Sequence, residues 1–167
     1  MIKWSILSFG ILLVAYLIFK SNSVPEYFKI DVIKSRGTPP PPELQGNARE
    51  LLKNINTIQY LLFKENPSYK ITIHSTYRSP AHNASIGGAT NSYHMKARAV
   101  DFSVQGLPAT QLHKLLYKWE IAGKLPAGGI GQGADYAHYD NKGTISTWKY
   151  RTDGSNSSYS VPLNTLT

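Results

Sequence analysis

The sequence predicts an α+β fold: a small, mainly antiparallel sheet with helices packed on it, preceded by an N-terminal transmembrane or signal segment. Three observations support this prediction. Apolar residues recur at helical spacing in two stretches, short stretches rich in β-branched and aromatic residues lie between glycine and proline turns, and an uncharged apolar run opens the chain. At 167 residues the chain has room for one folded domain with appendages.

The N-terminal segment, residues 1–23, is expected to meet a membrane. Residues 4–19 carry no charge and are mostly apolar, with Lys3 before them and Lys20 after them. As a helix this run spans about 24 Å, which is less than the roughly 30 Å hydrocarbon core of a bilayer but more than many signal-peptide cores. An uncleaved anchor and a signal segment cleaved before Val24 both remain open.

Two segments that flank the expected domain are predicted to lie outside its core. Residues 24–42 end in a run of prolines, and we interpret them as a Pro-rich spacer because proline fixes φ and keeps the preceding residue extended. Residues 151–167 are polar, rich in serine and without periodicity, so a loosely ordered tail is expected there. Residues 43–150 remain for the domain itself.

This domain contains the expected helices and strands. Apolar side chains recur at helical intervals in residues 43–64 and again from Leu112 to Trp119, so two amphipathic helices are predicted. A short helical turn is expected at residues 81–86. The expected strands, each bounded by turn residues, are residues 71–77, 97–104, 128–131, 136–140 and 144–150.

Composition narrows the partners and the chemistry. The formal net charge of +8 favours an anionic partner such as a cell-wall polymer or a phospholipid surface. The basic residues are scattered and form no recognisable nucleic-acid module, so no nucleic-acid partner is expected. The chain has no cysteine, which excludes disulfides, thiolate metal ligands and a cysteine nucleophile. A transition metal would therefore be bound by histidine and carboxylate.

Three side chains form the candidate metal site: His94, Asp101 and His138. Proteins build catalytic zinc sites from imidazole nitrogen and carboxylate oxygen, and three such ligands leave a fourth position for water. In the expected strand 97–104, alternation places small alanines on the face of Asp101, which leaves room for an ion. The sequence therefore predicts a Zn²⁺ site, provided that the strands of Asp101 and His138 are neighbours.

Two carboxylates are candidates for a general base. Asp135 precedes His138 by three residues and follows a glycine-rich turn that can aim its side chain at the metal. Asp140 is the alternative, and it can instead orient an imidazole N–H. Arg78, at the end of an expected strand, is suited to bind a substrate carboxylate or to stabilise an oxyanion.

Other side chains near these positions are predicted to have supporting or structural roles. The further candidates for contacts with the ligands or with a substrate are Tyr77, Ser92 and Tyr139. Trp148 is interpreted as a packing residue of the core or of a sheet edge. The remaining histidines are interpreted as structural: His74, His82 and His113.

Several short motifs occur in a fixed order: Thr76-Tyr77-Arg78-Ser79-Pro80, His82-Asn83, Gly87-Gly88, Ser92-x-His94-x6-Asp101, and Gly129-Ile130-Gly131 ahead of His138-x-Asp140. Over residues 43–148 this series resembles the zinc D-alanyl-D-alanine carboxypeptidase and murein endopeptidase family, the LAS-type peptidoglycan metallopeptidases. Members of that family cut peptide bonds of peptidoglycan, commonly next to a D-amino acid. The resemblance implies the fold class and these roles: zinc ligands at His94, Asp101 and His138, a base at Asp135 and a substrate contact at Arg78.

The chain departs from the family pattern at three positions. Ala97 and Tyr139 stand where members often have glycine and valine, and both changes are compatible with a metal site. Asp135 stands where several branches have glutamate, so its shorter side chain requires a closer backbone.

With this resemblance, the expected function is that of a membrane-anchored or secreted zinc peptidase, facing the periplasm or cell exterior and hydrolysing peptidoglycan peptides. One alternative is a non-catalytic cell-wall-binding or virion structural protein that retains the metal site. Another is a metal-dependent nuclease, which the basic charge suggests. The sequence leaves open whether a stem or a cross-link is cut, whether cleavage is of the endo- or carboxypeptidase type, and the oligomeric state.

Overall fold

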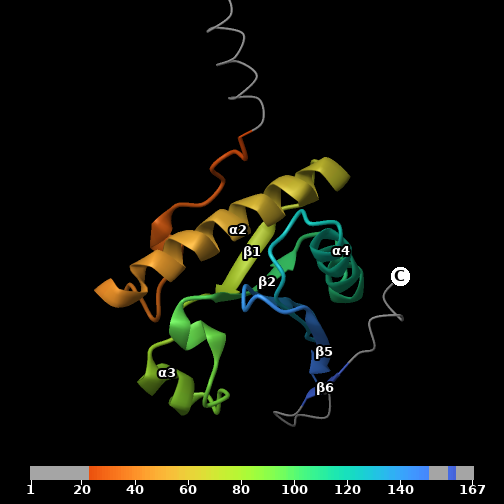
Figure 1. The fold of residues 1–167 in the computed structure, drawn as a ribbon. Coiled ribbons are helices and arrows are strands. Elements are labelled where there is room, and N and C mark those ends of the chain that lie inside the picture. The colour runs from red at the N-terminus through yellow and green to blue at the C-terminus, as the bar shows by residue number, and fades with distance from the viewer. Residues whose placement is uncertain (1–22, 151–157, 161–167) are drawn as a thin grey trace, which may run out of the picture.

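Residues 23–150 and 158–160 are described by the computed structural model, in which two long helices lie on one face of a six-stranded sheet (Figure 1). The α-helices are α2 (Gln45–Glu65), α3 (Pro80–Ser85) and α4 (Ala109–Ile121). Short 3-10 helices are η1 (Ile30–Val32), η2 (Pro42–Leu44) and η3 (Tyr93–Lys96). The strands are β1 (Ile71–Ser75), β2 (Ala99–Val104), β3 (Gly129–Gln132), β4 (Ala137–Asp140), β5 (Ser146–Tyr150) and β6 (Ser158–Ser160).

The sheet has the strand order β1-β2-β4-β3-β5-β6. All neighbouring strands are antiparallel except β3 and β5, which run parallel. The chain reverses direction after β3 and again after β4, so β5 has the direction of β3 when it pairs with the free edge of that strand. The predicted α+β class is confirmed, and the sheet, expected to be mainly antiparallel, is mixed.

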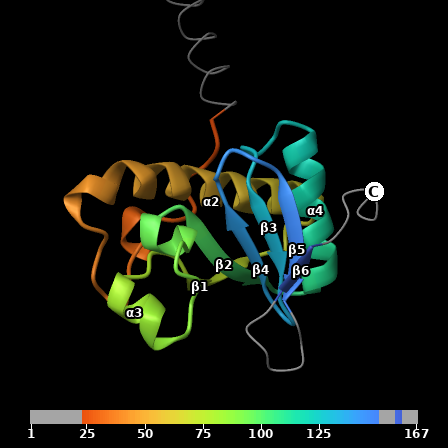
Figure 2. The ribbon, with the colours of Figure 1, turned by 60° about the horizontal axis from the view of Figure 1, so that its bottom comes forward.

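The hydrophobic core lies between this sheet and the two long helices, which Figure 2 shows on the same side of the strands. Both helices present apolar residues at intervals of three and four, as the sequence pattern predicts. Burial of each of these side chains contributes about 1.5–3 kcal/mol to folding. The main contributors are Leu51, Ile55, Ile58 and Leu62 of α2, Leu112, Leu116 and Trp119 of α4, and Val100, Phe102, Ile130 and Tyr139 of the sheet.

Strand β2 begins at Ala99, two residues later than expected, because Ala97 adopts a left-handed backbone with φ of 52°. Its N–H group donates to the carbonyl of His94 and closes η3. A left-handed conformation costs an L-residue about 1–2 kcal/mol, whereas glycine adopts it freely. Ala97 is fully buried, so the packing around it holds this turn in place.

The segment 24–42, expected to be a spacer, is instead docked on the domain. The Asn56 carboxamide of α2 accepts the N–H of Phe28 at 2.8 Å and donates to its carbonyl at 3.2 Å. The Thr76 hydroxyl bonds to the chain at Val32 and Lys34, and Ile33 is buried in the core. The local proline pattern does not predict these long-range contacts. Because of them, the folded unit begins before residue 43.

The remaining predictions concern the two ends of the chain. The apolar N-terminal segment lies outside the described residues apart from Ser23, and within the described part of the chain no helix has the length and apolar character needed to cross a bilayer. In the expected tail, Ser158–Ser160 form β6 and pair with β5, so these three residues differ from the loose order predicted for them. The rest of that tail also lies outside the described residues.

The docking of residues 24–42 predicts a stability effect at Asn56. Asn56→Ala should lower the free energy of unfolding by about 1–3 kcal/mol, because it removes the three partly buried hydrogen bonds that join α2 to the backbone of residues 27 and 28. Urea unfolding followed by tryptophan fluorescence measures this change. Thr57→Ala is the matched control, since it removes only a hydroxyl bonded within α2, and it should change stability by less than about 0.5 kcal/mol. Equal stability of the two variants would contradict the docking.

Candidate metal centre

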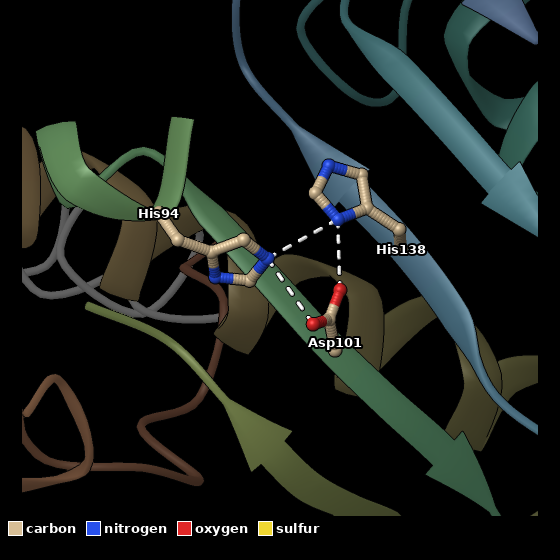
Figure 3. Close-up of side chains that lie close together, drawn as sticks. All are labelled: His94, Asp101 and His138. Atoms are coloured by element: carbon tan, nitrogen blue, oxygen red, sulfur yellow. Dashed lines mark hydrogen bonds and ion pairs between the residues drawn. The ribbon is translucent and has the colours of Figure 1, made fainter. Parts of the chain in front are cut away.

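The three predicted ligands come together, although they come from three separate elements. His94 lies in η3, Asp101 in β2 and His138 in β4, and their potential ligand atoms all lie within 4.8 Å of one another (Figure 3). His138 Nδ1 is 2.8 Å from one carboxylate oxygen of Asp101, and His94 Nε2 is 3.2 Å from the other. The two imidazole nitrogens are 3.3 Å apart. All three residues are buried.

The register of the sheet brings two of these ligands face to face. In the β2–β4 pair Asp101 lies directly opposite His138, which is the strand adjacency that the metal-site prediction required. Side chains alternate along a strand, so His138 and Asp140 share the face that carries Asp101. The face opposite to the helices therefore holds the site.

Each imidazole is oriented by a hydrogen bond from the nitrogen that faces away from the cluster. His94 Nδ1 donates to the carbonyl oxygen of Thr76 at 2.5 Å, and His138 Nε2 donates to Asp140 at 3.4 Å. These bonds aim His94 Nε2 and His138 Nδ1 at Asp101, and without a metal His138 Nδ1 carries a proton that it donates to this carboxylate. Loss of that proton would free the nitrogen to bind a metal ion. Metal-binding histidines commonly have such a carbonyl or carboxylate partner. The set of two imidazoles and one carboxylate fits Zn²⁺.

Asp140 is held rigidly in this orienting position. Its Oδ1 accepts the N–H groups of Gly129 at 3.0 Å and Lys142 at 3.1 Å, while its Oδ2 faces His138. Burial by itself raises the pKa of the Asp140 carboxyl. The hydrogen bond from His138 and the charge of His138 outweigh burial and keep the pKa of Asp140 below the usual range. Both oxygens of Asp140 are thus engaged.

Arg78 follows β1, which ends at Ser75 rather than at residue 77 as expected, and contacts Asp101. Its Nη2 pairs with Asp101 Oδ2, and its Nε donates to Ser75 Oγ at 2.8 Å. Burial by itself raises the pKa of the Asp101 carboxyl, but hydrogen bonds from His138 and His94 hold that pKa well below its usual range. Asp101 is therefore ionised and ready to bind a cation.

Asp135, the other candidate base, is exposed in the turn between β3 and β4. It is not among the described residues that line the cleft over the metal cluster. Burial is the main cause of the raised pKa of the Tyr136 hydroxyl, and the charges of Asp101 and Asp135 raise it further. Asp135 is therefore within electrostatic range of a side chain that does line the cleft.

A cleft of about 650 Å³ opens over the three ligands. One wall comes from the segment between α3 and η3, and it includes Ser92, whose hydroxyl accepts the His94 N–H at 3.3 Å. The opposite wall is polar and aromatic. Its members are Tyr136, Lys142, Trp148 and Tyr150.

Two tyrosines predicted to contact ligands or substrate lie elsewhere. Tyr139 is fully buried on the helix-facing side of β4, where its hydroxyl donates to the carbonyl of Pro126 at 3.0 Å. Alternation along the strand explains this, because the neighbours of His138 must point to the opposite face. Tyr77 is also part of the hydrophobic core.

Trp148, interpreted from sequence as a packing residue, forms part of the cleft and contacts His138. The two ring centroids are 5.3 Å apart at an angle of 50°. The indole also covers β3, where a Cβ on Gly131 would lie 2.7 Å from its Nε1 and a Cβ on Gly129 would lie 2.9 Å from its Cη2. Alternate glycines in a strand were the available signal, because they indicate that a bulky group lies against that face.

The protonation of His138 predicts how the stability of metal-free protein depends on pH. Burial alone would lower the pKa of His138, but its bonds to Asp101 and Asp140 raise it from 6.5 to about 9. A raised histidine pKa stabilises the fold fully below 6.5, and this contribution is lost as the pH rises through about 9. Urea unfolding of chelator-treated protein should therefore show stability falling across this interval.

His138→Asn provides the control for this pH dependence. Burial raises the pKa of Glu120 to about 8, and its ionisation lowers stability in the same direction, so only the part of the slope that disappears in His138→Asn belongs to His138. Identical slopes in the two proteins would contradict the assignment.

Comparisons with known proteins agree with the geometry. A family model described as Peptidase M15 matches residues 34–140, which is more than half of the chain. The probable peptidoglycan L,D-endopeptidase MepK of Haemophilus influenzae is 36% identical over 80 residues, which cover 44% of this chain and 39% of that protein. The match thus spans less than two thirds of that relative's length. The family resemblance predicted from the sequence is confirmed, and the chain belongs to the peptidase M15 family.

Proposed function

We propose that this protein is a zinc-dependent peptidase that hydrolyses peptide bonds of peptidoglycan. The observation that carries this proposal is the buried cluster of His94, Asp101 and His138, in which two oriented imidazole nitrogens and an ionised carboxylate converge at the floor of a cleft. Membership in the peptidase M15 family and the similarity to a protein named as a peptidoglycan endopeptidase support it.

In this proposal His94, Asp101 and His138 hold the ion. Zn²⁺ bound there would supply an acidified water and would polarise the substrate carbonyl. Asp140 keeps the His138 imidazole in the correct tautomer, and the Thr76 carbonyl does the same for His94. The cleft walls limit the access of bulk water to the reacting bond.

Arg78 binds the negative charge of the substrate. Its Nε and Nη2 are engaged by Ser75 and Asp101, and this fixes the guanidinium plane at the edge of the cleft. A guanidinium has five N–H donors, so further donors remain for a peptide carboxylate or for an oxygen that gains charge during cleavage.

We assign the general base to Asp135, the position implied by the family pattern, and the orienting role to Asp140. The engagement of both Asp140 oxygens supports this division, because a carboxylate that is fully hydrogen-bonded with a lowered pKa is a poor proton acceptor. Asp135 is exposed on the turn beside Tyr136, so its side chain is free to turn toward a substrate in the cleft.

The location proposed for the domain is the periplasm or cell exterior, with residues 1–23 as a membrane anchor or a cleaved signal. The apolar run at residues 4–19 supports this proposal, and so does the position of peptidoglycan outside the cytoplasmic membrane.

A non-catalytic peptidoglycan-binding protein is the second candidate function. The exposure of Asp135 outside the cleft lining favours it, because a site that binds metal without a positioned base can recognise a peptide and leave it intact.

Metal binding and murein digestion test the main proposal. The purified protein should contain about one zinc ion per chain and release soluble peptides from murein, whose masses identify the bond cut. His138→Ala should remove the metal and all cleavage, because it deletes one of three ligands. The matched control His74→Ala alters an exposed histidine outside the cluster and should keep both. Folded protein that binds no zinc would contradict the proposal, and zinc-loaded protein that binds murein without cutting it would favour the second candidate.

Substitution of Asp135 should affect turnover, whereas substitution of Asp140 should affect zinc binding. Asp135→Asn should keep zinc and lose about 10²–10⁴-fold in turnover, as expected for loss of a general base. Asp140→Asn should weaken zinc binding by about 10–100-fold, because the His138 N–H loses its carboxylate partner. Zinc titration with a competing chelator and peptide release are measured on both variants. Full turnover in Asp135→Asn would refute the assignment of the base.

A further inference from the structure

A line of alternating charges crosses the floor of the cleft. Arg78 pairs with one oxygen of Asp101, and the other oxygen accepts from His138 Nδ1 at 2.8 Å. On its far side His138 Nε2 faces Asp140, which accepts the backbone N–H of Lys142 at 3.1 Å. Figure 3 shows that only one ring nitrogen of His138 points to Asp101. Arg78 follows β1, whereas the Lys142 ammonium contacts Ser146 and Trp148 of β5, and the strands of Asp101 and His138 lie between β1 and β5 in the sheet. The two cations therefore lie on different sides of the candidate metal centre.

The ammonium group of Lys142 is held in place at the cleft wall. Its Nζ donates to Ser146 Oγ at 2.6 Å and lies 5.3 Å from the ring centroid of Trp148, which in turn packs against His138. The side chain is half-buried and lines the same cleft as Arg78. An ammonium has three donors, so donors remain after the bond to Ser146 for an anionic ligand.

Each of the two cations of the cleft has a carboxylate near it: Arg78 pairs with Asp101, and the charge of Lys142 acts on Asp140. Among the described residues that line it, the carboxylates are Asp101 and Asp140, and each is already bound by histidine. Asp101 belongs to the metal cluster, and both oxygens of Asp140 have other partners. With a divalent cation in place the lining carries an excess of positive charge, which favours an anionic peptide.

We propose that Lys142, held by Ser146 and Trp148, forms a carboxylate-binding subsite across the metal centre from Arg78. The cleft then selects a peptide that carries a free carboxylate on each side of the cleaved bond. This inference rests on the proposed function and names its substrate class. Trp148 supports the subsite in two ways, because its ring stabilises the ammonium by a cation–π contact and its position against His138 fixes the distance to the reacting bond.

Binding of four peptides tests the subsite. In each peptide a ketomethylene unit replaces the scissile amide, so that the zinc-loaded protein cannot cleave it. The four peptides differ only in the residues that flank this unit. One peptide has a free carboxylate on both sides of the unit, one on the N-terminal side only, one on the C-terminal side only, and one on neither side. A primary amide replaces each missing carboxylate. Isothermal titration calorimetry should show the tightest binding for the peptide with both carboxylates.

Lys142→Met should abolish the preference for a carboxylate on one side and leave the preference on the other side intact. The affinity for the doubly charged peptide should fall by about tenfold, the effect of losing one hydrogen bond to a charged group. Lys142→Arg should retain most of this affinity. The matched control is Lys149→Met, because Lys149 lies on β5 next to Trp148 but outside the cleft lining, and it should bind all four peptides as the unchanged protein does. A Lys142→Met protein that discriminates among the four peptides as well as the unchanged protein would overturn the subsite.

The outcome for this subsite is separable from the outcome for catalysis. Binding that depends on Lys142, with no cleavage of the corresponding amide peptide, supports the subsite and overturns the peptidase function. Cleavage of that peptide, with equal affinity for carboxylate and amide forms, overturns the subsite and keeps the peptidase function.

Discussion

The register between β2 and β4 is the constraint on which the site depends. It places Asp101 opposite His138 and, one residue away, Val100 opposite Tyr139. Val100 and Tyr139 are both buried in the core, and the Tyr139 hydroxyl is anchored on the Pro126 carbonyl. A slip of one residue would turn His138 into the core and Tyr139 into the cleft, because side chains alternate along a strand. Core packing on one face of the sheet thereby sets the geometry of the candidate metal ligands on the other.

The third ligand depends on backbone outside the sheet. His94 is carried by η3, which ends at the left-handed Ala97 before β2 begins. Two hydrogen bonds tie His94 to the segment that follows β1: its carbonyl accepts the N–H of Arg78 at 3.1 Å, and its Nδ1 donates to the Thr76 carbonyl. The same short segment after β1 thus positions a candidate ligand and Arg78. Arg78 and His94 are thus coupled through the backbone of this segment.

The cleft is built from residues inside the region that matches the family model and from residues that follow this region. The metal cluster and Asp140 lie within the residues that match the Peptidase M15 model, which end at residue 140. Trp148 and Tyr150 of β5 follow that region and build the facing wall. The glycines of β3 connect the two parts, because Gly129 and Gly131 leave the space that the Trp148 indole occupies. The lining of the cleft therefore includes β5 as well as the matched region.

By itself, the sequence determined the features that depend on local periodicity and on an ordered motif. The long helices followed from apolar spacing, and the ligands followed from the series that contains His94, Asp101 and His138. Only the tertiary structure decided the parallel pairing of β3 with β5, the docking of residues 24–42 through Asn56, and the position of Trp148 on His138. These features rest on contacts between residues far apart in the chain, and the free energy of such contacts depends on the packing of the whole fold, which no local pattern contains.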